Sequence, residues 1–146
     1  MQNFPHHYAV TASSAADDNV ALNSAGLETI ESAAPVEFDG PGGHWSPETL
    51  LVAAVADCFV LSFKAVARAS KFAWVSLRCD VEGVLDRVDG VTQFTQFNLH
   101  VVLDMAPGTD EQRAMRLLEK SEHVCLITNS LHAETHLDAE LRSSAA

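Results

Sequence analysis

The longest apolar stretch of the sequence limits the folds that this chain can adopt. Residues 50–63 contain only two polar side chains, Asp57 and Ser62. The stretch is too short for a transmembrane helix, which needs about 20 consecutive apolar residues. A helix that is apolar on all sides is stable in water only when most of its surface is covered. We therefore expect a long helix buried in the centre of the fold.

The residues before this stretch mark the start of the helix. Ser46 suits the N-cap position, Pro47 suits the first helical position, and Glu48 suits the positive end of the helix dipole. Basic residues follow in the last turns, where the dipole favours them. The sequence therefore predicts a helix from Pro47 to about Ser70.

Alternation of apolar and polar residues predicts strands on both sides of this helix. Ser24-Ala25-Gly26 and Asp89-Gly90 are typical of tight turns. A second helix is expected to begin at Thr109 or Asp110, and to end near Glu122 or to continue, kinked, to Leu131. The expected strands cover residues 6–13, 19–23, 27–33, 75–82, 97–103 and 133–141.

This order of elements predicts a single α+β domain over residues 1–146, in which a mainly antiparallel sheet packs against helices. A central helix that is apolar all round needs more cover than one small sheet provides. A homodimer that encloses the helix between two copies would supply that cover.

The charge of the chain excludes several classes of partner. Nine Lys and Arg stand against 20 Asp and Glu, which gives a net charge of −11 at pH 7. Nucleic acids and anionic membranes bind cationic surfaces, so neither is an expected partner. The N-terminal sequence lacks the basic and apolar segments of a secretory signal, and the cysteines are few and odd in number. We therefore expect a cytoplasmic protein without a disulfide framework.

The three cysteines, Cys58, Cys79 and Cys125, are the residues best suited to chemistry. Core packing would explain each of them, because unpaired cysteine is among the most buried residue types. That role fits Cys79 best, since it lies on the apolar face of a predicted strand. Cys58 within the apolar helix and Cys125 at a helix break could instead be nucleophiles. A free thiol with a pKa near 8.5 is only about 3% thiolate at pH 7, so a reactive thiol needs a cation or hydrogen-bond donors nearby.

Two segments together resemble the OsmC/Ohr family of osmotically induced and organic-hydroperoxide-resistance proteins. The first is Ser46-Pro47-Glu48 with the run LLVAAVADCF at 50–59, and the second is CLITNSL at 125–131. The resemblance covers the order of elements from about His6 to Leu141. It implies the OsmC/Ohr-like fold, an intertwined homodimer with two active sites at the subunit interface.

The resemblance also implies an activity, the reduction of organic hydroperoxides by a thiol peroxidase that needs no metal or organic cofactor. Cys58 would be the peroxidatic cysteine and Cys125 the resolving cysteine, which closes a disulfide on the sulfenic acid. Glu48 would correspond to the glutamate that orients a catalytic arginine in the family. A dithiol of the lipoyl type would be the reductant.

One part of that site is missing from this sequence. The family's arginine lies in the N-terminal strands, whereas this chain has no Lys or Arg before Lys64, and residues 13–19 are SSAADDN. Another cation could replace it, the peroxidase could be slow, or the thiols could have another function. The candidate cations are His44, which comes first because it directly precedes the N-cap segment, and His6, His7 and Arg68 across the interface.

Helix geometry connects Glu48 to the expected dimer. Ten residues separate Glu48 from Cys58, which is about 15 Å along a helix axis, so the two cannot meet within one straight helix. Two copies that cross antiparallel near Ala53 and Ala54 would bring Glu48 of one protomer close to Cys58 of the other.

Two other interpretations stay open beside the peroxidase. The first is a non-peroxidase member of the family that binds a small apolar ligand in the interface pocket, and the second is a structural dimer with inert cysteines. No CxxC or HExxH pattern is present, so no metal site is expected. The aromatic side chains near the helix mostly suit the core, although one or two could line an apolar pocket beside Cys58: Trp45, Phe59, Phe63, Phe72 and Trp74.

Overall fold

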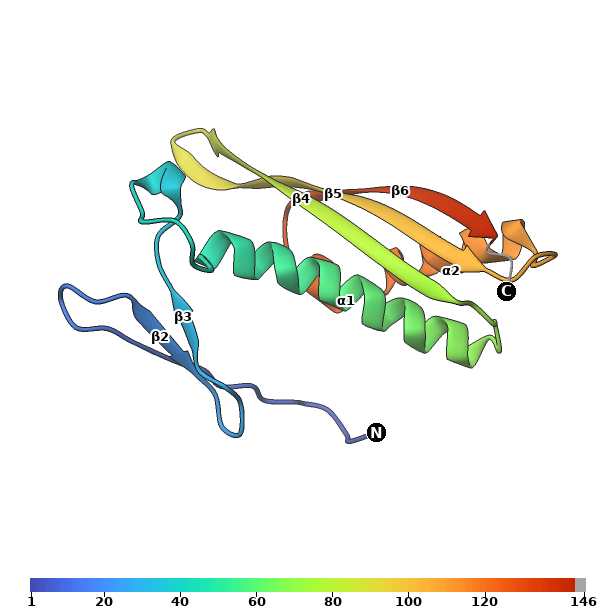
Figure 1. Ribbon diagram of the computed structural model, residues 1–146, viewed down its shortest axis with the longest axis horizontal. Helices are drawn as coiled ribbons and strands as arrows, with labels where there is room; N and C mark the ends of the chain where they lie inside the picture. Colours follow the sequence, from blue (N-terminus) through green and yellow to red (C-terminus); the bar gives the residue numbers. More distant parts are fainter. Residues whose placement is uncertain (144–146) are drawn as a thin grey trace. The chain divides into compact units, whose positions relative to one another are not determined.

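The computed structural model describes residues 1–143, and its elements are shown in Figure 1. Two compact units, Met1–Leu51 and Val52–Ala146, divide the chain, with the boundary inside the long helix. The elements are β1 (Thr11–Ser13), β2 (Val20–Asn23), β3 (Ile30–Ser32), η1 (Val36–Phe38), α1 (Pro47–Ala69), β4 (Ser76–Val88), β5 (Val91–Met105), α2 (Glu111–His123), α3 (Leu126–Asn129) and β6 (Glu134–Ser143).

The first unit contains a small antiparallel sheet in the order β1-β2-β3. Leu22 at its centre pairs with Ala12 on one side and Ile30 on the other. Gly26 turns the chain between β2 and β3 with a φ of 77°, a conformation that glycine adopts without steric cost. The predicted hairpin is confirmed, whereas the predicted strand at 6–13 is reduced to Thr11–Ser13, because β2 is only four residues long and offers no further partners.

The start of α1 is fixed by reciprocal hydrogen bonds, as the sequence predicts. The Thr49 amide donates to Ser46 Oγ at 3.1 Å, and the Ser46 amide donates to Thr49 Oγ1 at 2.8 Å. This arrangement satisfies donors that the first turn of a helix otherwise leaves free. Ser46 is buried. The cap therefore determines where Glu48 enters the helix.

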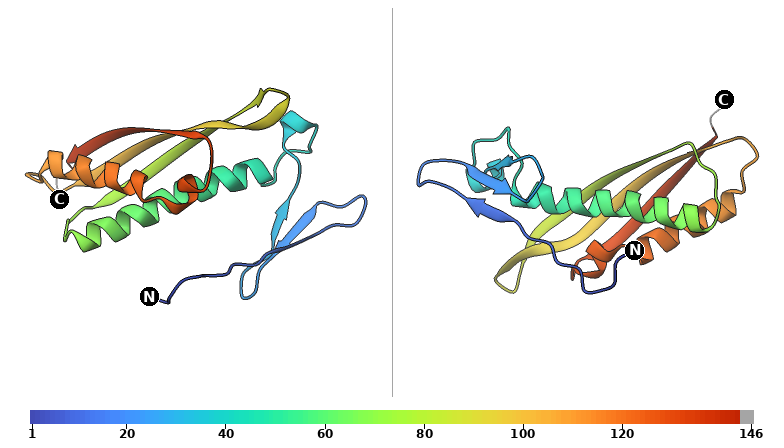
Figure 2. Two further views of the ribbon diagram at one scale, coloured as in Figure 1. Left: turned by 180° about the vertical axis from the view of Figure 1, so that it is seen from behind. Right: turned by 90° about the horizontal axis from the view of Figure 1, so that it is seen from below.

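The second unit contains the sheet β4-β5-β6, with α1 and α2 on the same face (Figure 2). β4 and β5 form a long antiparallel hairpin that turns at Asp89 and Gly90, both of which have positive φ. β5 and β6 are parallel, since α2 and α3 carry the chain back to the end of the sheet from which β5 starts. The α+β class is confirmed, and three of the four strand pairs are antiparallel.

The core of the second unit lies between this sheet and its helices. Alternate residues of β5 from Phe97 to Met105 are buried beneath the helices, and the intervening residues face outward. Gly83 on β4 allows α1 to approach closely, because a Cβ atom there would lie only 2.7 Å from Val52 Cγ2. The α1 side chains buried in this core form one stripe: Val55, Phe59, Phe63, Val66 and Ala67.

The helix α1 is buried on one side only within the chain. Leu61 is 56% exposed, and Leu51, Val52 and Val60 are half-buried. In the described residues α1 is the one helix that is long and apolar enough to cross a membrane, a test of length and composition that core helices also pass. The sequence predicted a helix covered on most sides. Within the described residues, only the side of α1 that faces the sheet is covered.

We predict that Ser46→Ala destabilises the protein by about 1–2 kcal/mol, because it removes the acceptor for the Thr49 amide at a buried helix start. Denaturant unfolding followed by circular dichroism measures the change. Ser13→Ala, at an exposed position of β1, is the control and should change stability by less than about 0.5 kcal/mol. Equal effects of the two substitutions would show that the cap does not stabilise the fold.

Candidate functional site

Cys58 lies in the middle of α1, within the second unit, and is half-buried. It is at the edge of the buried stripe, next in sequence to the fully buried Phe59. Its Sγ atom is 3.9 Å from the hydroxyl oxygen of Ser62, one helical turn further along. Cys58 is therefore held by its own helix with its sulfur beside a polar group.

Cys125 occupies the short break between α2 and α3. It is the N-cap residue of α3, only 1% exposed, and its carbonyl oxygen accepts from the Asn129 amide at 3.0 Å and the Thr128 hydroxyl at 3.1 Å. The sequence left open whether the second helix ends near Glu122 or continues, kinked, to Leu131. The structure contains a break, because α2 ends at His123 and α3 begins at Leu126. Of the α3 amides, that of Thr128 acts on the Cys125 thiol and favours its thiolate against the larger effect of burial.

The structure brings Cys58 and Cys125 together. Burial raises the pKa of the Cys125 thiol, the backbone amide of Thr128 opposes this, and the hydrogen bond with Cys58 raises the pKa further. Two thiols that interact from separate elements are candidates for redox chemistry, because a disulfide forms when one sulfur attacks the oxidised form of the other. The predicted roles of Cys58 and Cys125 stay predictions.

Cys79 lies on β4 and faces the same core. Burial raises the pKa of its thiol to about 12, and the charge of Asp80 and the neighbouring Cys125 contribute to the same effect. A thiol with such a pKa is almost entirely protonated at neutral pH and is a poor nucleophile. This agrees with its predicted role in core packing.

Two residues of the site were not singled out from the sequence. Ser62 follows Cys58 by four positions on a helix, a spacing that puts two side chains on the same face. Thr128 follows Cys125 by three positions, which is the spacing at which a helix amide faces its N-cap residue. Both spacings can be read from the sequence, but neither identifies a site residue unless the cysteine is already known to be functional.

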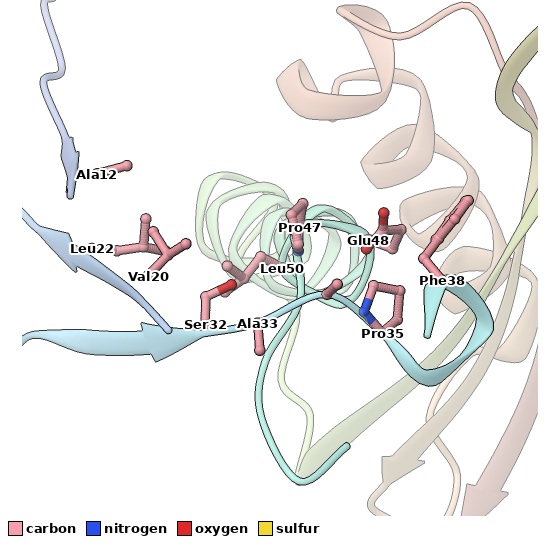
Figure 3. Close-up of a pocket in the computed structure, with 11 residues that line it drawn as sticks. Ala12, Val20, Leu22, Ser32, Ala33, Pro35, Phe38, Pro47, Glu48 and Leu50 are labelled. Atoms are coloured by element: carbon pink, nitrogen blue, oxygen red, sulfur yellow. The ribbon is translucent and has the colours of Figure 1, made fainter. Parts of the chain in front are cut away.

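Glu48, the third predicted site residue, lies in the first unit. It lines a hollow of about 440 Å³, shown in Figure 3, which we name the Glu48 hollow. The other lining side chains are almost all apolar and come from β1, β2, the end of β3 and the loop after it, η1 and the start of α1. Because α1 is one continuous helix, Glu48 and Cys58 are about 15 Å apart along its axis. A single α1 does not bring these two residues together.

The candidate substitutes for arginine are placed as follows. His44 is hydrogen-bonded to Asn19 at 3.4 Å and lies 4.0 Å from the carboxylate of Glu31. It lines a second, smaller hollow with Trp45 and Thr49, not the hollow that contains Glu48. His6 stacks on Phe4 and is exposed, as are His7 and Arg68. Within residues 1–143 no group of three or more His, Cys, Asp or Glu side chains could hold a metal ion.

Comparison with known proteins now identifies the family. The sequence model for "OsmC-like protein" matches residues 40–140. The chain belongs to the OsmC-like family. The match includes Glu48, Cys58 and Cys125.

Relatives of this OsmC-like protein include both uncharacterized and named proteins. It is 26% identical over 140 residues to the uncharacterized protein YmaD of Bacillus subtilis (strain 168), covering 92% of this chain and 93% of the relative. It is 34% identical over 99 residues to an organic hydroperoxide resistance protein of Xanthomonas axonopodis pv. citri (strain 306), covering 66% of each. The fold matches that of an OsmC-like protein of unknown function from Vibrio cholerae, with a TM-score of 0.85, 16% identity, and 93% and 100% coverage of the two chains.

We predict that Cys79 is the slowest of the three thiols to react with iodoacetamide at pH 8. Its pKa of about 12 leaves little thiolate at that pH, so its rate should rise about tenfold per pH unit up to pH 12. Peptide mapping by mass spectrometry measures each rate, and the denatured protein, in which all three should react alike, is the control. Rapid modification of native Cys79 would contradict this environment.

Proposed function

We propose that this OsmC-like protein is a thiol peroxidase that reduces organic hydroperoxides through Cys58 and Cys125. The observation that carries the proposal is the interaction between the two thiols, half-buried Cys58 on α1 and buried Cys125 at the start of α3. A relative of this chain is named as an organic hydroperoxide resistance protein, which supports the same substrate class.

In the proposed cycle, the Cys58 thiolate attacks the terminal oxygen of the hydroperoxide. A sulfur–oxygen bond forms, the oxygen–oxygen bond breaks, and the alcohol leaves after taking a proton. The Cys125 sulfur then attacks the Cys58 sulfenic acid, so that a disulfide forms and water leaves. Cys58 acts first because it is the more exposed of the two, and Cys125 resolves because its buried thiol interacts with that of Cys58. A dithiol of the lipoyl type, in the cytoplasm, would return both cysteines to thiols by exchange.

The proposal includes a homodimer. The side of α1 away from the sheet retains exposed apolar surface, including Leu61 at 56%. Two antiparallel copies of α1 that cross near Ala53 and Ala54 would cover this surface. The same crossing would bring Glu48 of one protomer close to Cys58 of the other, where the carboxylate could position whichever cation replaces the missing arginine.

A second function, ligand binding without peroxidase activity, is favoured by one specific observation. The Glu48 hollow is large enough for a small ligand and is lined mostly by apolar side chains. The family's arginine has no counterpart before Lys64. In this function the hollow would hold the ligand and the cysteines would be sensors or bystanders.

We predict that one equivalent of cumene hydroperoxide converts the reduced protein to a Cys58–Cys125 disulfide. Cys58→Ser should abolish peroxide consumption, and Cys125→Ser should stop the cycle at a sulfenic acid on Cys58 that dimedone traps. Peptide mapping by mass spectrometry identifies each product.

Cys79→Ser is the matched control for these variants and should turn over at the wild-type rate. Thiols that stay unmodified after minutes with the hydroperoxide would overturn the peroxidase proposal and leave ligand binding as the function.

We predict that Leu61→Glu weakens the homodimer at least about tenfold, because it places a charge in the apolar surface that the second copy covers. Sedimentation equilibrium measures the dissociation constant. Val75→Glu adds the same charge at a site that is 60% exposed and off the helix, and should leave the constant unchanged. A monomeric wild-type protein would contradict the proposed dimer.

A further inference from the structure

Basic side chains gather on two helices of this acidic chain. Six of the nine Lys and Arg lie on α2 or between Lys64 and Lys71, and residues 60–71 contain no Asp or Glu. Within residues 1–143, five of the six are exposed and form no ion pair with the chain's own acids. We name these five the basic surface: Lys64, Arg68, Lys71, Arg116 and Lys120. Their charges are available to another molecule.

The sixth base, Arg113, joins the two helices. It donates a hydrogen bond to the Ser70 carbonyl oxygen, just past the end of α1, and its guanidinium lies 5.5 Å from the centre of the Phe72 ring. At the other end, Cys58 of α1 interacts with Cys125, which follows α2. The two helices therefore run side by side in opposite directions on one face of the sheet (Figure 2).

The bases of α2 lie on the flank of that helix that faces α1. At about 100° per residue, Arg113, Arg116 and Lys120 fall within about 60° of one another around the helix. Since Arg113 reaches the end of α1, the other two lie toward α1 as well. The acidic residues of α2 lie elsewhere around the helix, two on the opposite flank and one on the outer surface: Glu111, Glu122 and Glu119.

The basic surface begins beside the thiol pair and lies clear of the proposed helix crossing. Lys64 follows Cys58 by six residues, which is about 9 Å along α1, and Lys120 precedes Cys125 by five. The proposed crossing of two α1 helices is centred about ten residues before Lys64, or about 15 Å away along the axis. A partner on the basic surface would therefore reach the thiols without displacing the second copy.

The extent of the basic surface and the charge of the whole chain indicate the kind of partner. Lys64 and Lys71 alone are about 10 Å apart along α1, and the bases of α2 widen the surface further, so a macromolecule fits it better than a small anion. Nucleic acids and anionic membranes present extended negative charge, which the net charge of −11 repels. A protein with an acidic patch of limited size meets only the bases.

We propose that the basic surface is the docking site of an acidic protein that carries a dithiol and reduces the oxidised pair of Cys58 and Cys125. The inference rests on the proposed peroxidase function and adds the charge and the docking place of the partner that completes the cycle. Opposite charges would speed the encounter and orient the partner on the two helices.

Docking there would bring the dithiol to the disulfide. One thiolate of the partner attacks the sulfur of Cys58, the more exposed cysteine, and Cys125 leaves as a thiolate. The second thiolate of the partner then attacks the partner's own sulfur in the mixed disulfide, so that Cys58 also leaves as a thiolate. The partner ends as a disulfide, two electrons pass to this protein, and both of its thiolates take protons from water.

Isothermal titration of the full-length, reduced protein with three synthetic peptides tests docking by itself. Each peptide has the core Ser-Gly-Gly-Ser, flanked on both sides by glutamates, glutamines or lysines, so that the three differ only in charge. We expect the glutamate peptide to bind most tightly at low salt and to lose this advantage at about 0.5 M NaCl, where screening is strong. Lys64→Glu and Arg116→Glu should each weaken its binding about three- to tenfold.

Arg87→Glu is the matched control for these variants. It makes the same change of charge at an exposed position of β4, near the turn of the β4–β5 hairpin and away from α2. Because exposed charges beyond about 10 Å are screened at moderate salt, it should change the affinity for the glutamate peptide less than about twofold.

A second measurement, on the oxidised protein, tests the redox role. The same peptides with the core Cys-Gly-Gly-Cys act as reductants of the Cys58–Cys125 disulfide, and peptide mapping follows the thiols that appear. Lys64→Glu and Arg116→Glu should slow reduction by the glutamate peptide about three- to tenfold and leave reduction by the glutamine peptide unchanged. Each comparison uses one peptide with two proteins, so the effect of the flanking charges on the peptide thiols cancels.

Three outcomes would overturn the proposal. The first is equal binding of the three peptides, and the second is an equal effect of Arg87→Glu and Arg116→Glu. The third is a weaker homodimer in Lys64→Glu or Arg116→Glu by sedimentation equilibrium, which would mean that acidic residues of a second copy cover the basic surface. If the wild-type protein forms no Cys58–Cys125 disulfide, the peroxidase proposal fails, and preferential binding of the glutamate peptide would then show docking and reject the redox role alone.

Discussion

The rest of this structure depends on α1, a helix with more apolar surface than its own chain covers. The sheet β4-β5-β6 buries one stripe of α1 and thereby places Cys58 at the edge of that stripe, where a sulfur is neither sealed in the core nor free in solvent. The start of the same helix is tied to the small sheet, since Ser32 bridges to Trp45 and the Ala33 amide donates to the Trp45 carbonyl at 2.9 Å. The helix α1 thus carries Glu48 and Cys58, two of the predicted site residues.

The two cysteines illustrate how burial and local donors divide chemical roles among identical side chains. Cys79 and Cys125 both have raised pKa values, because Cys125 is buried and Cys79 is partly buried. Cys125 differs in having the Thr128 amide and hydroxyl beside its sulfur, which stabilise negative charge, whereas Cys79 has only the repulsive carboxylate of Asp80 and Cys125 itself. Local donors therefore distinguish two thiols whose pKa values burial raises alike.

Much of the fold could be predicted from the sequence, because local signals agree with the tertiary structure. The cap at Ser46, the turn at Asp89 and Gly90, and the N-cap at Asp110 each appear where the residue types favour them. The lengths of β4 and β5 and the parallel pairing of β6 could not be predicted in this way, since they depend on partners distant in sequence. For the site, the roles of Cys58 and Cys125 rest on the family resemblance and stay predictions, whereas the unpaired Oε2 atom of Glu48 could be found only from coordinates.

The parallel pairing of β5 with β6 also sets an order of folding. The β4–β5 hairpin is local and can form as soon as residues 76–105 have left the ribosome, whereas β6 pairs with β5 only after α2, α3 and residues 134–143 have been synthesised. Until then β5, the central strand of the finished sheet, is an open edge with apolar residues on one face. Open strand edges of this kind promote aggregation. Pairing of the ten-residue strand β6 covers the edge of β5 and so ends the period in which the nascent chain exposes it.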